Sequence, residues 1–299
     1  MRLIPIVLIL AAGLGLAACG GGEPSRTEQP PTTAGPAEPP AISYDADPTS
    51  VVVDVTPLPG FVPAEIAVDS RPRFRLYGDG TVIARPADEA LGGFPALDTY
   101  RLSEAGIEWV LELADTEGLL SPAPDYGQPP VTDVGTETAT ITAGGVQVSH
   151  SVYAPGFEDD SAGLTTEQLA ARAAFSRFVA QVIALPRARP DLLAGPAGPY
   201  TPESVAVFAF ELDPATEGAT VEDWPLSTPL GDEPADTQSG IPCFEASGSD
   251  LETLEDAFAG EGLGRVWRSG TTADGDPRLW SVGLNPVLPG DTGCPAATG

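Results

Sequence analysis

The chain has 299 residues and is strongly acidic, since 43 Asp and Glu residues against 14 basic residues give a formal net charge of −29. That charge excludes nucleic acid as a partner and excludes electrostatic docking on anionic lipid, because both would repel the surface. Hydrophobic residues make up 42% of the chain, enough for a folded core.

The chain begins with the pattern of a signal peptide. Arg2 supplies one positive charge, and residues 3–16 form an apolar run shorter than the roughly 20 residues that a transmembrane helix needs. The run ends in Leu16-Ala17-Ala18-Cys19, which resembles the lipobox of bacterial lipoproteins. An ordinary cleaved signal peptide and an uncleaved anchor are the alternatives.

The lipobox resemblance implies a location as well as a modification. It implies removal of residues 1–18, a diacylglycerol and palmitate on Cys19, and attachment to the extracytoplasmic face of the cell membrane. The use of arginine alone as basic residue, with abundant Gly and Pro, makes the chain similar to lipoproteins of high-GC Gram-positive bacteria. The mature domain resembles no characterised family.

Residues 19–50 are predicted to form a disordered tether behind the lipidated cysteine. They are rich in Pro, Gly, Thr and Glu and contain few large apolar residues, so they bury too little surface to offset their ordering entropy. A random coil of this length spans on the order of 30 Å. The tether therefore holds the folded part clear of the membrane.

Residues 51–186 are predicted to form an α+β domain that starts with a strand. The β-branched run 51–55 favours a strand that ends at the following prolines, Pro57 and Pro59. Two antiparallel hairpins follow, because alternating apolar and polar arms flank glycine-rich turns at residues 78–80 and 143–145.

Each hairpin is followed by a predicted amphipathic helix. Ser103 caps the first helix, and Gly118 ends it. Thr165 and Gln168 form a capping box at the start of the second helix, and Pro186 is predicted to stop it. The two ββα units predict an antiparallel sheet with two or three covering helices; duplication and chance similarity both remain open.

Residues 187–299 are predicted to form a connector and a second α+β part. The expected elements are a strand at 204–212, a long loop at 213–240, a helix with a capping box at Ser249, and a final hairpin. Whether residues 205–299 form a separate domain stays open at this stage.

Cys243 and Cys294 are predicted to form a disulfide. Lipidation of Cys19 leaves them as an even pair in an oxidising compartment. The bond would tie the end of the chain to the start of the last helix.

The sequence assigns no catalytic residue. His150 is the single histidine and lies between Ser149 and Ser151, whose side chains point to the other face of a strand. A surface or half-buried strand histidine is therefore the favoured interpretation, ahead of a Ser-His-Asp triad.

Acidic residues are abundant but unspecific. Paired carboxylates for hydrolysis or a calcium site would have to come from a set in which no pair stands out: Asp125, Asp133, Glu158, Asp159, Asp160, Asp274 and Asp276. A calcium-binding loop with its closing glutamate is missing, and we assign no metal and no cofactor.

Trp267 and Trp280 are the candidate binding residues, because the last hairpin places them opposite each other. They predict either an aromatic binding platform or a cross-strand core pair.

The favoured hypothesis is a lipid-anchored, non-enzymatic module that binds an envelope protein, a cell-wall ligand or a small molecule. A surface-anchored hydrolase that uses carboxylates or calcium is the alternative. The solute-binding lipoprotein of a transporter is disfavoured, since it needs two lobes of alternating strands and helices.

Overall fold

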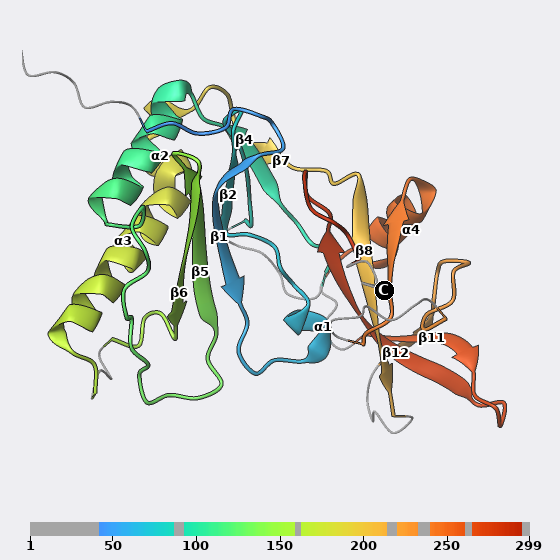
Figure 1. The fold of residues 1–299 in the computed structure, drawn as a ribbon. Coiled ribbons are helices and arrows are strands. Elements are labelled where there is room, and N and C mark those ends of the chain that lie inside the picture. The colour runs from blue at the N-terminus through green and yellow to red at the C-terminus, as the bar shows by residue number, and fades with distance from the viewer. Residues whose placement is uncertain are drawn as a thin grey trace, which may run out of the picture. The chain divides into compact units, whose positions relative to one another are not determined.

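The computed structural model describes residues 42–86, 93–158, 163–213, 220–232, 240–260 and 265–294. The predicted signal peptide, Cys19 and most of the predicted tether lie outside the described residues, as do Asp159 and Asp160. The fold is α+β, as predicted, with two sheets and four α-helices among the described residues (Figure 1).

The first sheet has seven strands, and every neighbouring pair is antiparallel. Both predicted hairpins are present in it, as β2–β3 and β5–β6. In spatial order, the strands are β6 (Val146–Tyr153), β5 (Thr136–Ala143), β1 (Val51–Leu58), β2 (Phe74–Tyr77), β3 (Thr81–Ala84), β4 (Asp98–Arg101) and β7 (Gly198–Pro199).

Strand β1 lies between the two hairpins and ends at Leu58, directly before Pro59 as predicted, but it runs through Pro57, so the prediction was wrong for that proline. The carbonyl of Val55 accepts from the backbone N–H of Arg73, on the β2 side. Residues two apart in a strand direct their backbone groups to the same side, so the nitrogen of Pro57 also faces the β2 side. At that point β2 has no residue to pair with, because it begins at Phe74. No ladder hydrogen bond is lost.

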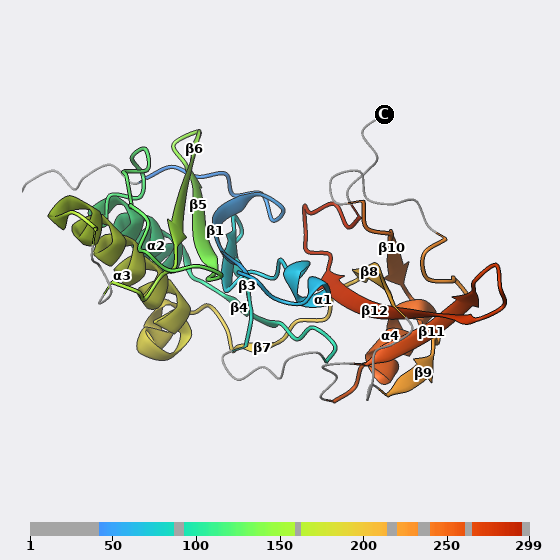
Figure 2. The same cartoon turned by 90° about the horizontal axis from the view of Figure 1, so that it is seen from below.

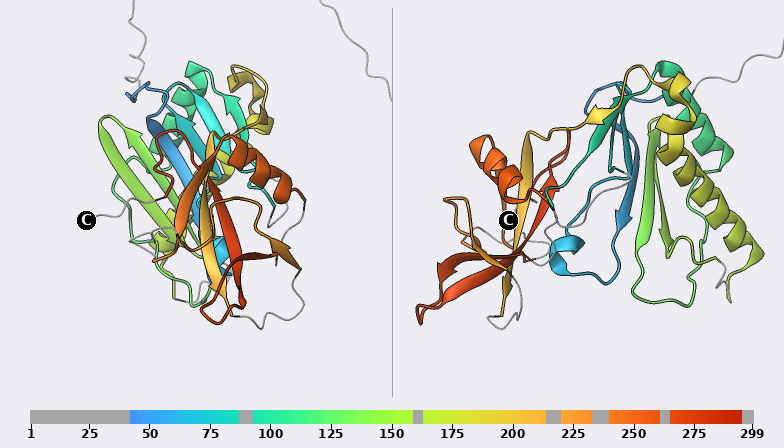
Figure 3. Two further views of the ribbon diagram at one scale, coloured as in Figure 1. Left: turned by 90° about the vertical axis from the view of Figure 1, so that its right-hand side faces the viewer. Right: turned by 180° about the vertical axis from the view of Figure 1, so that it is seen from behind.

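Helices α2 (Glu104–Thr116) and α3 (Thr166–Ala188) cover one face of the first sheet, as Figures 1 and 3 show. Both predicted N-caps are confirmed: Ser103 accepts from the N–H of Gly106, and Thr165 and Gln168 form a complete capping box. Pro186 does not stop α3, because it removes one backbone bond while Arg189 still donates to Leu185.

A dry core fills the space between these helices and the sheet. Alternation along each strand sends one set of side chains toward the helices, and the apolar stripes of α2 and α3 meet them. By length and composition α3 is apolar enough to cross a membrane, but its stripe belongs to this core. The larger core residues include Val53, Val55, Phe74, Leu76, Val110, Leu111, Phe175, Phe178 and Val182.

The second sheet has five strands and one covering helix, α4 (Ser249–Ala257), as Figure 2 shows. Its pairs are antiparallel except for β9 with β11. In spatial order the strands are β10 (Cys243–Ser247), β8 (Ser204–Leu212), β12 (Pro277–Pro286), β11 (Val266–Thr271) and β9 (Val221–Asp223).

Two local predictions in this part were wrong. Gly248 is the N-cap of α4 in place of Ser249. It is the single residue between the end of β10 at Ser247 and the start of the helix, and its φ of 56° is one that glycine adopts readily. The predicted loop 213–240 contains β9 and buries Trp224 and Leu230 in the second core. Its few apolar residues were enough to anchor it.

Ordered structure reaches into the predicted tether. Ile42 and Tyr44 pack against the first core, and the carbonyl of Ser43 accepts from the N–H of Gly144. Residues 42–50 therefore belong to the folded part.

The two sheets belong to one compact unit. The short helix α1 (Ala64–Ala67) and the segment after it pack on β12, where a side chain at Gly283 would collide with Val68 and the Glu65 carbonyl. The short strand β7 and the 3-10 helix η1 (Pro190–Leu192) occupy the predicted connector. Residues 205–299 belong to the same compact unit as the first sheet.

Candidate functional site

A cavity of about 590 Å³ lies between the first sheet, on the face away from its helices, and the second sheet. Residues from the first sheet and from the segment before β2 form one side of it: Asp54, Thr56, Leu58, Val68, Ser70, Arg75, Thr138 and Thr140. Residues from the second sheet and the chain end form the other: Ala206, Phe208, Ile241, Asn285, Pro286, Val287, Asp291, Thr292 and Gly293.

The first sheet gives the cavity a polar wall. Because side chains alternate, the strand that sends Val53 and Val55 into the core turns Asp54 and Thr56 the other way. On β5 the same alternation exposes Thr138 and Thr140, whose hydroxyls hydrogen-bond Ser151 at 3.0 Å and Ser149 at 3.1 Å. We call this surface the polar wall.

Arg75 is the centre of the polar wall. Its Nε and Nη2 donate to Oδ2 of Asp54 at 3.1 and 2.7 Å, and its Nη1 donates to Oδ2 of Asp291 at 2.7 Å. The Arg75 side chain is 10% exposed, that of Asp54 20% and that of Asp291 39%. The guanidinium therefore joins the first sheet to the end of the chain.

The two carboxylates compensate the burial of this guanidinium. Burial alone would lower the pKa of Arg75, but attraction to Asp54 and Asp291 and their hydrogen bonds outweigh it and raise the pKa above the usual arginine value. The group stays charged, and the ion chain of two carboxylates and one guanidinium carries a net charge of one negative unit.

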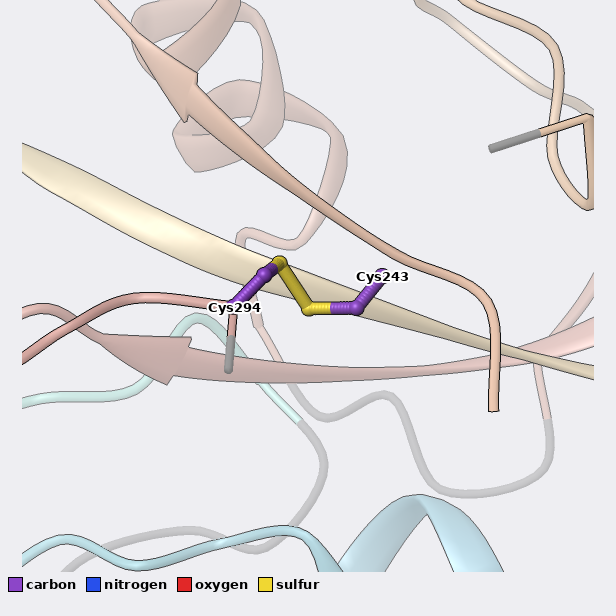
Figure 4. Close-up of a disulfide and its surroundings, with 2 residues drawn as sticks. All are labelled: Cys243 and Cys294. Atoms are coloured by element: carbon purple, nitrogen blue, oxygen red, sulfur yellow. A yellow bond between two sulfur atoms is a disulfide. The ribbon is translucent and has the colours of Figure 1, made fainter. Parts of the chain in front are cut away.

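The second sheet gives the cavity an apolar wall. Ala206, Phe208 and Ile241 belong to a small apolar cluster built around the Cys243–Cys294 disulfide. The bond predicted from the cysteine count is present, with 5.7 Å between the Cα atoms (Figure 4). We call this surface the apolar wall.

Residues 287–294, here called the C-terminal strap, line one side of the cavity and contact both sheets. Leu288 is buried with Tyr77 and Ile83 of the first sheet. Asp291 pairs with Arg75, and Cys294 is bonded to Cys243 of β10. The strap is thus fixed at both ends and in the middle.

Two acceptor atoms at the cavity lack partners among the described residues. Oδ1 of Asn285 is buried without a hydrogen bond, while its Nδ2 donates to Ser70. Asp291 uses only Oδ2 in its ion pair with Arg75 and is partly exposed. By contrast, both oxygens of Asp54 are engaged, since Thr56 donates to Oδ1 at 2.7 Å.

His150 is buried, at 1% exposure, so the prediction of a surface or half-buried histidine was wrong. Its Nε2 lies 3.0 Å from the Leu119 carbonyl, which can only accept, so Nε2 donates, and its Nδ1 lies 2.7 Å from the Tyr126 hydroxyl, to which it is hydrogen-bonded. Burial raises the pKa of Tyr126 to about 12. Both ring nitrogens are used structurally, and neither reaches a serine hydroxyl among the described residues.

Two of the acidic residues considered for hydrolysis or calcium, Asp125 and Glu158, make local structural contacts. Asp125 accepts from the N–H of Gly127 and from Gln168, and Glu158 pairs with the buried Arg172. Within the described ranges, no three His, Cys, Asp or Glu side chains converge as a metal site would require.

Trp267 and Trp280 face each other across β11 and β12 in the predicted register. Each is only 2% exposed, and Trp267 packs against Trp224 and Phe258 in the second core. The pair is a core contact and offers no open platform.

Sequence reasoning missed the ion chain, although part of the signal was available. Asp54 interrupts a β-branched strand, and Arg75 occupies an alternating position between Phe74 and Leu76. Charges at such positions indicate a polar second face. Nothing local to Asp291 indicated its partner.

Comparison of the chain with protein families, with curated proteins and with solved structures found no match. The cavity therefore has to be interpreted from its own residues.

Replacing Arg75 with Met should destabilise the protein by about 3 kcal/mol, because it leaves two carboxylates facing each other without a cation. This is the low end for a buried ion pair, since Asp291 keeps access to water. Urea unfolding measures the change. The triple variant D54N/R75M/D291N should recover most of the loss, and equal loss in both variants would contradict the role given to charge.

Replacing both Cys243 and Cys294 with Ser should lower the free energy of unfolding by up to about 4 kcal/mol, the chain-entropy value for a loop of this length. The strap then loses one of its attachments. Hydrogen exchange should increase in residues 287–294 and stay unchanged in hairpin β5–β6. Equal exchange in the strap with and without the disulfide would show that Leu288 and Asp291 hold it unaided.

Proposed function

We propose that this protein is a lipid-anchored, non-enzymatic binding module that holds a small amphipathic molecule in the cavity between its sheets. The proposal rests on one observation: the polar wall and the apolar wall face each other across the same cavity. A ligand with polar groups along one edge and an apolar body would satisfy both.

The size of the cavity supports a small molecule. Ligand sites are usually clefts of roughly 300–1,000 Å³, lined mainly by apolar side chains with a few placed polar groups. At about 590 Å³ the cavity falls within this size range, and Arg75 and Asp54 are fixed by hydrogen bonds, although its lining is more polar than usual because the polar wall forms one side. Fixed polar groups lose little freedom when a ligand binds.

The cavity gives less support to the alternative hydrolase. A carboxylate pair that cleaves a glycosidic bond needs one member that keeps a proton as general acid. Asp54 and Asp291 both accept hydrogen bonds from the same guanidinium, so each acts as an acceptor. This arrangement favours holding a ligand over transferring a proton to it.

The proposed anchor is the lipid on Cys19, with residues 20–41 as tether. A membrane attachment through lipid is consistent with the formal charge of −29, which would repel an anionic membrane surface. Such a module would meet ligands at the cell envelope, either cell-wall fragments or small molecules.

Filling the cavity should abolish binding without unfolding the protein. Thr140 lines the cavity on β5, whereas Thr142, two residues along the same face, does not. We expect T140W to lose every thermal shift that a panel of small sugars, amines, alcohols and carboxylates produces in the unmodified protein. The matched variant T142W should keep them, and shifts that survive in T140W would place binding elsewhere.

Replacing Cys19 with Ser should release the protein from the membrane fraction, because the thiol that would carry the lipid is gone. Cell fractionation with labelled palmitate measures both attachment and acylation. C243S should stay in the membrane fraction as a control for cysteine loss. Retention of C19S with the membrane would refute lipid anchoring and leave the cavity unaffected.

A further inference from the structure

We propose that the polar group of the ligand is a primary ammonium carried on an aliphatic stem, an inference that rests on the proposed binding function. It follows from the net charge of the ion chain and from the hydrogen-bond acceptors at the cavity that have no partner among the described residues.

The first argument is the charge left on the ion chain. Arg75 is the only cation among the described residues that line the cavity, and it is shared by Asp54 and Asp291. One negative charge is therefore uncompensated inside a partly enclosed space. The formal charge of −29 on the whole chain adds a field that concentrates cations and repels carboxylates and phosphates.

The second argument is the kind of hydrogen-bonding atom that is left over. Oδ1 of Asp291 is an acceptor without a partner among the described residues, and the Asp291 side chain is partly open to solvent. The hydroxyls of Thr138 and Thr140 can accept further bonds. An ammonium group brings three donors and no acceptor, which is the complement of this set.

The third argument is the apolar wall opposite. Phe208, Val287 and Ile241 present hydrocarbon to the cavity within reach of the same ligand. A stem of several methylene groups would bury its apolar surface against this wall, while its charged end stays with the carboxylate. A small inorganic cation would leave this wall unused.

The same chemistry occurs in free alkylamines and in lysine side chains of peptides, so the test uses both. Calorimetric titration compares hexylammonium and N-acetyl-lysine methylamide with 1-hexanol and hexanoate. We expect both amines to bind, hexanol to bind at least roughly tenfold more weakly, and hexanoate not to bind. Binding of hexylammonium alone would assign a free amine as the ligand.

Variants at Asp291 separate charge from shape. D291N should weaken amine binding roughly tenfold or more, as expected when a charged hydrogen-bond partner is removed, and leave hexanol binding unchanged. D291E should retain amine binding, and D115N, an exposed acid on α2, should have no effect. Urea unfolding of each variant confirms that it is folded.

Ionic strength gives an independent measurement. Amine binding should weaken as salt rises from about 0.01 M to 0.1 M, over which the screening length falls from about 30 Å to about 10 Å. Hexanol that binds as tightly as hexylammonium, with both lost in T140W, would overturn the ammonium inference and leave the binding function standing. Failure of both amines to bind would overturn the inference, and a panel without any T140W-sensitive ligand would overturn both.

Discussion

The burial of one guanidinium determines how this protein is assembled. Arg75 points away from the dry core, toward the second sheet, and a charge in that position requires carboxylates on both sides. One of them, Asp54, comes from the neighbouring strand, and the other, Asp291, comes from the strap. The ion chain therefore joins the first sheet to the strap, and the cavity lies beside it.

The cavity arises because the two faces of one sheet carry different residues. The face toward α2 and α3 is aliphatic and aromatic, and the opposite face carries Thr, Asp and Arg. The second sheet places hydrocarbon against that polar face in place of a second dry core. The site is therefore a property of how two sheets meet, and no short motif in the chain encodes it.

The features that the sequence predicted correctly depend on neighbours along the chain. Hairpin turns need glycine at fixed places, and Ser103 and Thr165 cap helices through residues three positions away. The disulfide was predicted because assigning Cys19 to the lipid leaves Cys243 and Cys294 as a pair. The errors at Pro57, Ser249 and His150 each depended on a contact or a strand end that local pattern does not specify. Asp291 was out of reach for the same reason.

The distance of Asp291 from its partner along the chain also sets an order of events. Arg75 and Asp291 lie 216 positions apart, whereas the hairpin and helix-cap contacts of the first sheet are local. Closing so long a loop costs little extra stability, since each doubling adds only about 0.6 kcal/mol, but contacts of this kind form slowly. The cavity is completed only when Asp291 has met Arg75, and we expect this to follow the formation of the hairpins and helices of the first sheet. A completed cavity is thus a mark of a chain in which residues far apart in the sequence have already folded together.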